Sequence, residues 1–313
     1  MSSFAFVFPG QGSQSVGMLA ELGAAHAVVR DTFQQASDAL GYDLWQLAQS
    51  GPESELNATE RTQPALLAAG VAVWRAFRAE SGYRPAFMAG HSLGEYTALV
   101  CAGSVDFADA VKLVEFRGQA MQRAVPAGTG AMAAILGLED ADVRAACEEA
   151  AEGQVVSAVN FNSPGQVVIA GSKAAVERAI EICKAKGAKR ALPLPVSVPS
   201  HCALMQPAAN EMAARLAGVS IASPEIPVVH NVDVAMHDRP DDIRRALVEQ
   251  LYSPVRWTET VRFMADKGVT GVVECGPGKV LAGLNRRIEK SMNVIAVQDP
   301  AGLADAVQAA GEQ

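Results

Sequence analysis

The sequence is poor in aromatic residues and cysteines and has no long apolar run. Aromatic side chains make up 5% of its 313 residues, and no apolar stretch reaches the roughly 20 residues that a membrane-spanning helix needs. No basic segment followed by an apolar one, the pattern of a secretion signal, opens the chain. The five cysteines are an odd number without the spacing of metal ligands. We therefore expect a cytoplasmic protein with reduced thiols, no membrane contact and no metal.

The net charge excludes one large class of partner. Lys and Arg number 26 against 34 Asp and Glu, which gives a formal net charge of −8. Such a chain lacks the positive field that attracts phosphate backbones, so we expect no nucleic acid partner. An acidic protein can bind only through a local basic patch. Half of the residues are apolar, which is enough for an Ala/Val/Leu core in one large domain or in a domain with an insertion.

One serine lies in a Gly-x-Ser-x-Gly motif between a predicted strand and a predicted helix. The apolar run 85–89 precedes the motif, and residues 96–102 follow it with helical spacing. A strand, this motif and a helix form the nucleophile elbow of serine enzymes, in which a strained turn exposes the serine. The pattern predicts that Ser92 is a nucleophile. The alternative is a serine that caps a helix in a tight turn.

The two glycines of this motif have a steric purpose. Because Gly90 and Gly94 lack a Cβ atom, the strand and the helix can pass close together around Ser92. The new helix points free N–H groups toward the serine. The N–H of Leu93 is therefore the natural donor to an oxyanion.

A glycine-rich loop, residues 9–14, follows the first predicted strand, residues 4–8. A second oxyanion donor must come from another loop, and this loop is the best candidate in the sequence. The alternatives are a simple turn or a phosphate cradle. The loop is not a Walker A sequence, because no Gly-Lys-Ser/Thr follows.

Two other residues can contribute to chemistry at a nucleophilic serine. Arg117 lies among apolar neighbours in the predicted helix 107–123. It is either a structural cation or a guanidinium fork for a substrate carboxylate. His201 ends the proline-punctuated loop 195–201, where it is either a surface or capping residue or the general base for Ser92.

The middle of the chain has the element order of a ferredoxin-like unit. Strand, helix, strand, strand, helix and strand are predicted in turn at 131–136, 140–151, 155–159, 166–170, 174–186 and 189–194. The segments on either side are of the βα type that builds a parallel sheet. We predict an α/β fold with two parts: an α/β-hydrolase-like catalytic domain with a parallel sheet, residues 1–125 and 197–313, and an inserted ferredoxin-like subdomain, residues 126–196.

The rest of the chain supplies further elements of the larger domain. We expect helical residues at 19–50 with a break near Gly41, a turn at 56–60, a helix at 63–78 with Pro64 in its first turn, strands at 226–230 and 271–274, and a last strand and helix after 291. Within the insertion, residues 162–165 are expected to form a turn.

Five motifs, spread over nearly the whole chain, resemble those of a known family. They are Phe-Pro-Gly-Gln-Gly-Ser-Gln at 8–14, Gly-His-Ser-Leu-Gly-Glu at 90–95, Arg-Gly at 117–118, Val-Pro-Ser-His at 198–201 and Gly-Pro-Gly-Lys at 276–279. In this order they are similar to the malonyl-CoA:acyl carrier protein transacylases, the discrete acyltransferases of bacterial type II fatty acid synthesis. The resemblance implies an enzyme without a cofactor that moves malonyl from malonyl-CoA to the phosphopantetheine thiol of acyl carrier protein. We expect it to be a monomer.

The resemblance also implies a role for each residue of the catalytic group. Ser92 would be the nucleophile that carries the malonyl group between two half-reactions, with His201 as its general base. The backbone carbonyl of Gln250 would orient the imidazole, in place of the carboxylate of an ordinary triad. The N–H groups of Leu93 and Gln11 would stabilise the oxyanion.

Substrate selection is implied to depend on Arg117, which would bind the free carboxylate of malonyl. Acetyl-CoA would leave this buried guanidinium without a partner. The family's other substrate-binding positions correspond to Gln63, Met121 and Ser200. In modular polyketide acyltransferases, a serine directly before the catalytic histidine goes with a methyl-branched extender unit. Because Ser200 has that place here, we predict occasional tolerance of methylmalonyl.

Basic residues on the rim of the cleft are expected to dock the acidic carrier protein. The candidates are Lys189 and Arg190 in the small subdomain, together with Arg286, Arg287 and Lys290 near the end of the chain. The alternative is a solvated cluster of charges.

Three other functions compete with this one. A serine esterase or thioesterase would have the same elbow, but no acidic third member is signalled between Ser92 and His201, and Arg117 would have no task on a neutral acyl chain. A discrete acyltransferase that serves a polyketide synthase or a malonate decarboxylase would share all of the chemistry. A catalytically inactive binding module would not need an intact Ser92, His201 and Arg117.

Overall fold

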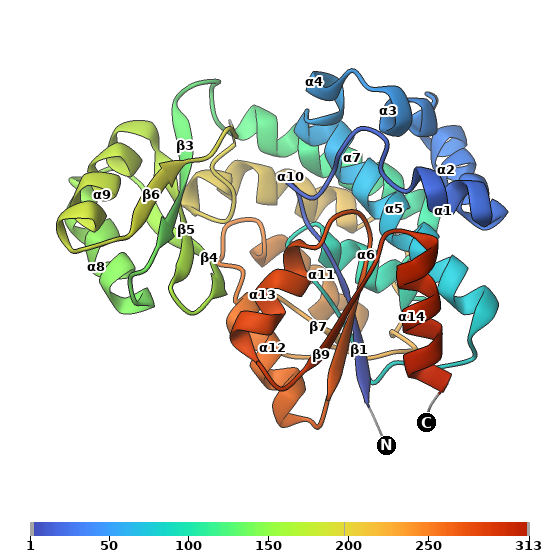
Figure 1. The fold of residues 1–313 in the computed structure, drawn as a ribbon. Coiled ribbons are helices and arrows are strands. Elements are labelled where there is room, and N and C mark those ends of the chain that lie inside the picture. The colour runs from blue at the N-terminus through green and yellow to red at the C-terminus, as the bar shows by residue number, and fades with distance from the viewer. Residues whose placement is uncertain (1–2, 197, 312–313) are drawn as a thin grey trace.

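Two separate β-sheets organise the chain (Figure 1). The computed structural model describes residues 3–196 and 198–311. A five-stranded sheet has the order β7-β2-β1-β8-β9, and its strands pair in parallel. A four-stranded sheet has the order β4-β5-β3-β6, and its strands pair antiparallel. The predicted α/β class, a parallel sheet with a small additional unit, is confirmed.

The larger sheet is formed by β1 (Phe4–Phe8), β2 (Phe87–Gly90), β7 (Val228–Val229), β8 (Gly271–Cys275) and β9 (Asn293–Val297). Its helices are α1 (Ala20–Ala25), α2 (Ala27–Leu40), α3 (Leu44–Ser50), α4 (Glu53–Leu56), α5 (Thr59–Glu80), α6 (Gly94–Cys101), α7 (Phe107–Ala124), α10 (Gln206–Leu216), α11 (Pro240–Glu249), α12 (Trp257–Asp266), α13 (Val280–Ile288) and α14 (Pro300–Gly311). A short 3₁₀ helix, η1 (Ala203–Met205), precedes α10.

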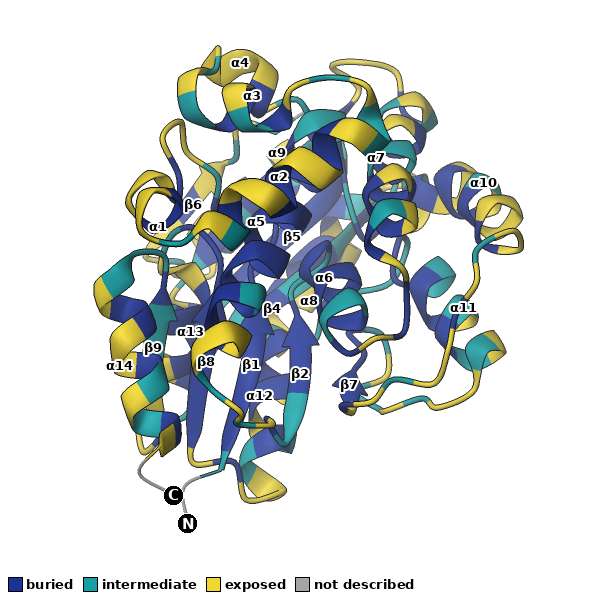
Figure 2. Ribbon diagram, turned by 90° about the vertical axis from the view of Figure 1, so that its right-hand side faces the viewer, coloured by how far each residue is buried: buried dark blue, intermediate teal, exposed yellow. Residues whose placement is uncertain are grey.

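Helices cover both faces of the larger sheet, and β1 shows why (Figure 2). Phe4, Phe6 and Phe8 point into a core shared with α2, α5, α6, α7 and α14. Ala5 and Val7 point to the opposite face, against α12 and α13. Alternate side chains of a strand face opposite sides, so a strand buried on both sides must be apolar throughout. This is why the run at 4–8 could be identified from the sequence.

The smaller sheet consists of β3 (Gly130–Leu136), β4 (Val156–Ser163), β5 (Gln166–Ser172) and β6 (Arg190–Pro193), with α8 (Asp140–Ala151) and α9 (Lys173–Ala185). Its strand order is that of a ferredoxin-like unit. Ile135, Phe161 and Ile169 pack against the two helices. Met132 and Val168, on the other face, pack near Cys202 of the larger unit.

The expected domain boundaries stay a prediction. Ser197, the first residue expected in the second catalytic segment, lies outside the described residues, as do residues 1–2 and 312–313 at the ends of the expected domains.

Some local predictions were wrong. Helix α5 begins at Thr59, within the predicted turn, and Pro64 lies in the interior of the helix rather than in its first turn. The buried hydroxyl of Thr62 donates to the Leu56 carbonyl at 2.6 Å, which ties the start of α5 to α4. Close packing also decides the start: a Cβ on Gly118 of α7 would lie 2.6 Å from the Glu60 Cα. Tertiary contact therefore extends the helix where sequence favours a turn.

Three other elements also differ from expectation. Strand β4 continues to Ser163, so the first two residues of the turn predicted at 162–165 belong to the strand. Strand β7, expected at 226–230, has only two residues, Val228 and Val229, which pair with β2. Helix α11 was not predicted. Its first turn contains Asp241 and Asp242, which favour a helix N-terminus.

No helix within residues 3–196 and 198–311 is long and apolar enough to cross a membrane. The five cysteines are free thiols. The same described ranges contain no group of three or more His, Cys, Asp or Glu side chains that could hold a metal ion.

Candidate active site

Ser92 lies at the sharp turn between β2 and α6. Its backbone has a φ of 52°, in the left-handed region that non-glycine residues rarely adopt. A Cβ on Gly90 would lie 1.8 Å from the Gly94 carbonyl carbon, and a Cβ on Gly94 would lie 2.1 Å from the Phe8 carbonyl oxygen. Neither position can accept a side chain. The steric reason expected for both glycines is therefore present in the structure.

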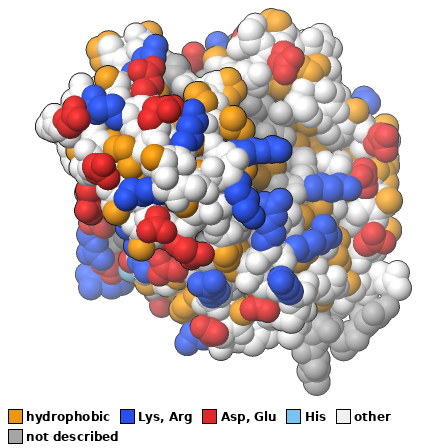
Figure 3. All heavy atoms as spheres, turned by 60° about the vertical axis from the view of Figure 1, so that its left-hand side comes forward, with side chains coloured by type: hydrophobic (Ala, Val, Ile, Leu, Met, Phe, Trp, Pro, Cys, Tyr) orange, Lys and Arg blue, Asp and Glu red, His pale blue; other side chains and the backbone are white. Residues whose placement is uncertain are grey.

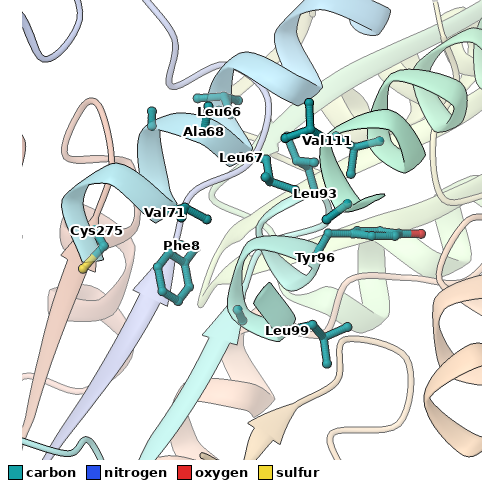
Figure 4. Close-up of a cluster of buried hydrophobic side chains, with 14 of the residues drawn as sticks. Phe8, Leu66, Leu67, Ala68, Val71, Leu93, Tyr96, Leu99, Val111 and Cys275 are labelled. Atoms are coloured by element: carbon teal, nitrogen blue, oxygen red, sulfur yellow. The ribbon is translucent and has the colours of Figure 1, made fainter. Parts of the chain in front are cut away.

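An apolar cluster holds α6 in place behind the serine (Figure 4). Leu93, the N-cap of α6, and Tyr96 and Leu99 within that helix belong to the same apolar core as Leu66 and Leu67 of α5. All five side chains are at most 2% exposed. Rigid packing of this kind fixes the direction in which the helix N-terminus points.

His201 faces the serine from the loop before η1. The Ser92 hydroxyl donates to His201 Nε2 at 2.8 Å, and His201 Nδ1–H donates to the Gln250 carbonyl at 2.8 Å. A carbonyl can only accept, so Nδ1 carries the proton and Nε2 is free to take one. The His201 backbone also has a positive φ, 64°, and its N–H donates to the Leu251 carbonyl at 3.0 Å. The segment after α11 thus fixes both the position and the tautomer of the imidazole.

The imidazole is held in its neutral form. Burial, and after it the charge of Arg117, lowers the pKa of His201 to about 3, while the bond to the Gln250 carbonyl opposes this shift. An imidazolium here would be desolvated next to a guanidinium. At neutral pH, His201 is therefore able to accept a proton.

Arg117 is a buried cation in α7, only 1% exposed. It donates to Gln63 Oε1 at 2.9 Å, to Gln250 Oε1 at 2.9 Å and to the Ser92 hydroxyl oxygen at 3.2 Å. These acceptors are all neutral, and none of the ion pairs found within the described part of the chain includes Arg117. Burial lowers the pKa of Arg117 from its ordinary value. A buried guanidinium without a carboxylate is a site prepared for an anion.

Tyr96 lies beneath this guanidinium, whose carbon is 5.4 Å from the centre of the tyrosine ring. Burial raises the pKa of Tyr96 to about 12, so its hydroxyl stays neutral. Within the described residues, the Tyr96 hydroxyl and the Arg117 Nε–H are buried without a hydrogen-bond partner. The ring therefore supports the cation through its π face rather than through a negative charge.

Two backbone N–H groups are available at the serine. Leu93 caps the N-terminus of α6, and Gln11 belongs to the glycine-rich loop after β1. That loop packs tightly on the elbow: a Cβ on Gly10 would lie 2.6 Å from the His91 carbonyl oxygen. No carbonyl of residues 3–196 or 198–311 accepts a hydrogen bond from either N–H. Both can therefore donate to an oxygen that enters the site.

A cavity of about 120 Å³ joins these groups. Its lining includes four residues expected to be catalytic, Gln11, Ser92, Leu93 and His201, and four expected to bind substrate, Gln63, Arg117, Met121 and Ser200. A second hollow of about 660 Å³ shares four lining residues with it, namely Gln11, Thr59, Leu194 and Val196. The small acyl-sized cavity therefore opens into a larger, more exposed space.

Residues 5–304 match the sequence model of a protein family, the acyl transferase domain. The chain belongs to the acyl transferase family. The malonyl CoA-acyl carrier protein transacylase of Escherichia coli (strain K12) is 63% identical over 308 residues, which cover 98% of this acyltransferase and 100% of the relative.

Two solved structures have the same fold as this acyltransferase. An acyl carrier protein S-malonyltransferase from Vibrio cholerae is 63% identical with a TM-score of 0.96, covering 97% of this chain and 100% of that one. The second is a malonyl-transacylase in complex with its type II PKS acyl-carrier protein. It is 60% identical with a TM-score of 0.97, covering 98% of this chain and 100% of that one.

The Gln250 side chain makes contacts in the acyltransferase site that sequence reasoning missed. Only its backbone carbonyl was expected to act. Its side chain also accepts from Arg117 and donates through Nε2 to the Ser92 carbonyl at 2.9 Å. One residue thus contacts His201, Arg117 and Ser92. No sequence signal predicts this, because the contact depends on how the loop after α11 meets the elbow.

A buried polar group beneath the elbow was missed as well. It consists of Glu95, His230 and Asn231, each fully buried. A usable signal existed, since His230 ends a predicted strand and Asn231 follows it, and the carboxyl ends of parallel strands meet at one edge of a sheet. The sequence position of Glu95, in the turn after Ser92, is a second signal.

Three of the five expected docking residues lie at one end of the small sheet. Leu136 of β3 pairs with Arg190 of β6 on one side and with Gln166 of β5 on the other. Lys189 precedes Arg190, and Arg287 from α13 donates to Gln166 Oε1 at 2.8 Å. Figure 3 shows Lys and Arg side chains gathered across the middle of this side of the acyltransferase.

In the part of the chain that the structure describes, no such contact joins the other two docking candidates to this group. Arg286 donates to the Val294 carbonyl of β9 at 2.9 Å. Lys290 is exposed near the end of α13.

Proposed function

We propose that this acyltransferase transfers the malonyl group of malonyl-CoA to the phosphopantetheine thiol of acyl carrier protein, through a malonyl ester on Ser92. The observation that carries the proposal is Arg117, a buried guanidinium 3.2 Å from the serine hydroxyl and without a carboxylate partner among the described residues. The names of the relatives support the same substrate. No cofactor is needed for this chemistry.

The first half-reaction forms the ester. The Ser92 oxygen attacks the thioester carbonyl while its proton passes to His201 Nε2. The carbonyl oxygen becomes an oxyanion that accepts hydrogen bonds from the Leu93 and Gln11 N–H groups. The C–S bond then breaks, and His201 returns the proton to the departing thiolate of coenzyme A. The second half-reaction repeats these steps in reverse with the carrier thiol as the nucleophile.

The substrate itself strengthens the base. In the empty site, the charge of Arg117 disfavours an imidazolium at His201. A malonyl carboxylate on Arg117 offsets this charge, which raises the pKa of His201 when a proton must be accepted. Acetyl-CoA brings no carboxylate. It therefore leaves Arg117 unpaired and His201 a weaker base. Discrimination that depends on an unpaired polar group reaches a ratio of about 10⁴ in kcat/KM.

Intact-mass measurement of acyl adducts tests this function. We expect malonyl-CoA, but not acetyl-CoA, to add one acyl group to the wild-type chain, and Ser92→Ala to remain unmodified. Arg117→Ala is expected to lose malonyl loading and gain acetyl loading. Arg178→Ala is a matched control, because that guanidinium donates to backbone carbonyls of Ala150 and Ala151, in the small unit. An adduct that forms equally from both thioesters in wild type contradicts the proposal.

The hydrolase alternative predicts a different fate for the adduct. A thioesterase or esterase would pass the malonyl group to water without a carrier. We expect the malonyl ester on Ser92 to persist in buffer and to disappear on addition of a carrier with its phosphopantetheine thiol. Rapid loss of the adduct without any carrier favours the hydrolase.

A second carrier has support from one comparison. The relative of 60% identity was solved with a type II PKS acyl-carrier protein. A polyketide carrier is therefore the main alternative to the fatty acid carrier, and a malonate decarboxylase carrier is the third. The kcat/KM values for transfer from malonyl-loaded enzyme to each carrier distinguish them, and we expect the highest value for the fatty acid carrier.

Lys189, Arg190 and Arg287 are proposed to dock the carrier, with Arg286 and Lys290 as weaker candidates. Strand β6 runs from Arg190 toward Leu194, which lines the cavity and its opening, so the same strand joins the basic group to the mouth of the site. Reversing the charges in Lys189→Glu/Arg190→Glu should raise the carrier KM about tenfold and weaken its salt dependence.

Two measurements complete the docking test. Malonyl loading from malonyl-CoA should be unchanged in the double variant. Lys112→Glu on α7 is the control for a single charge reversal outside the basic group. An unchanged carrier KM in the double variant eliminates these docking residues. The monomeric state and the cytoplasmic location stay predictions.

A further inference from the structure

Asn231 is a fully buried side chain that bridges the two sides of the elbow. Its Oδ1 accepts from the Ser92 N–H at 2.8 Å, and its Nδ2 donates to the Gly90 carbonyl at 2.7 Å. The orientation of the amide is fixed, because an N–H only donates and a carbonyl only accepts. We propose that Asn231 is a positioning residue that holds Ser92 in its reactive conformation.

Glu95 fixes Asn231 in turn. One carboxylate oxygen accepts from the Asn231 backbone N–H at 2.8 Å, and the other accepts from His230 Nδ1 at 2.8 Å. Glu95 belongs to the first turn of α6, whereas His230 and Asn231 follow β7. The carboxylate therefore ties the helix that begins at the elbow to the segment that carries Asn231. All three side chains are withdrawn from solvent, so water cannot replace these bonds.

The strain at Ser92 explains why such support is needed. A serine with a φ of 52° keeps this conformation only when its surroundings determine it. Asn231 holds the N–H of Ser92, and Gln250 Nε2 holds its carbonyl at 2.9 Å. Side chains from two different segments therefore form hydrogen bonds with both peptide groups that flank the serine.

Asn231 also determines which N–H groups face the substrate. Because it occupies the N–H of Ser92, that group cannot donate to the oxyanion, and the N–H of Leu93 remains for the task. Without Asn231, the Ser92 peptide can rotate, and its hydroxyl loses alignment with His201 Nε2. Arg117 lies on another helix and keeps its contacts with Gln63. The rate of acylation should fall while the affinity for malonyl-CoA stays.

The test separates positioning from binding and from stability. Asn231→Ala should slow single-turnover malonylation of Ser92 by about 100-fold, the usual effect of a displacement near 1 Å. The Kd of malonyl-CoA, measured by calorimetry with Ser92→Ala and with Ser92→Ala/Asn231→Ala, should agree within about twofold, because Arg117 keeps its contact with Gln63 in both variants.

Ser37→Ala is the matched control. The buried Ser37 hydroxyl also bridges two backbone groups: it donates to the Phe33 carbonyl at 2.8 Å and accepts from the Leu44 N–H at 3.0 Å, far from the elbow in sequence. We expect this variant to lower the melting temperature without slowing acylation. If Asn231→Ala loses no more acylation rate than Ser37→Ala at equal loss of melting temperature, the positioning role is overturned.

A second variant decides the question if Asn231→Ala does not fold. Glu95→Gln keeps the shape but removes the charge that receives two hydrogen bonds, and it should slow acylation about tenfold with an unchanged Kd. An unchanged acylation rate in that variant also overturns the proposal. The inference rests on Ser92 as the nucleophile: if wild type forms no malonyl adduct on Ser92, the proposed function fails first. If wild type forms it and Asn231→Ala forms it equally fast, only the positioning role fails.

Discussion

The two sheets contribute different parts of the site. The parallel sheet, buried on both faces, brings Ser92, Gln11 and Asn231 together, because the strands that precede them all end at the same edge. Within the described residues, the antiparallel sheet supplies none of the residues expected to be catalytic. One of its faces is covered by helices, and the other presents Met132 and Asn160 to the cavity as a wall. The comparison teaches that Ser92, Gln11 and Asn231 follow strands of the fully covered sheet, while the half-covered sheet shapes the cavity wall and carries one of the proposed docking residues, Arg190.

Removing the base tests the first half of this comparison. His201→Ala should lower the rate of malonyl loading by about 10² to 10⁴, because proton transfer from Ser92 then depends on water. Rapid-quench mass measurement of the adduct checks this. Met132→Ala, in the wall from the small sheet, is the matched variant and should leave the loading rate within a few-fold. Equal losses in both variants would break the comparison.

Gln250→Glu sharpens the role of the larger unit. The new carboxylate would pair with Arg117 permanently, at the position where Gln250 Oε1 now accepts at 2.9 Å. We expect malonyl loading to fall about 100-fold, because the substrate carboxylate must displace this internal partner. Acetyl loading should rise relative to malonyl. The ratio of the two adducts in a competition assay measures the effect, and an unchanged ratio would mean that Arg117 does not select the acyl group.

The pH dependence of Ser92 reactivity should reveal the charge of Arg117. A base whose pKa is lowered stays neutral down to lower pH. Because the pKa of His201 is about 3, the rate of Ser92 labelling should begin to fall only at a pH far below the ordinary pKa of a histidine. Arg117→Ala removes one cause of the low His201 pKa, so the fall in labelling rate should begin at a higher pH. The rate of labelling of Ser92 by an uncharged fluorophosphonate, followed against pH, measures both. If the labelling rate falls at the same pH in both proteins, the charge of Arg117 does not lower the pKa of His201.

Discrimination against a methyl branch is the smallest effect. A methyl group in a pocket changes the barrier by about 1 to 3 kcal/mol, so malonyl-CoA should be preferred over methylmalonyl-CoA by roughly 10- to 200-fold. Ser200 and Met132, which both line the cavity, are the residues we expect to set this ratio. Direct competition between the two thioesters measures it. A ratio above roughly 10³, beyond what a methyl in a pocket explains, would remove the predicted tolerance.

The sequence predicted best those features that local sterics and the chemistry of neighbouring residues both require. The elbow needs small residues at 90 and 94, and the structure places backbone atoms where their Cβ atoms would be. The order of elements in the small sheet followed from hydrophobic periodicity alone. The same reasoning was wrong about the start of α5, because burial against α7 outweighs the turn preference of residues 56–60. It missed α11, which contributes few residues to the core.

The sequence by itself determined the chemical types: a serine between two obligatory glycines, a cation on an apolar helix and a histidine in a loop. Only the tertiary structure decided how these groups act on one another. The neutral state of His201, the unpaired charge of Arg117 and the grip of Asn231 and Gln250 on Ser92 depend on segments that lie 25 to 158 residues apart in the chain. Such contacts arise from the packing of whole elements and leave no local pattern, because hydrogen bonding and desolvation depend on distance in space rather than along the sequence.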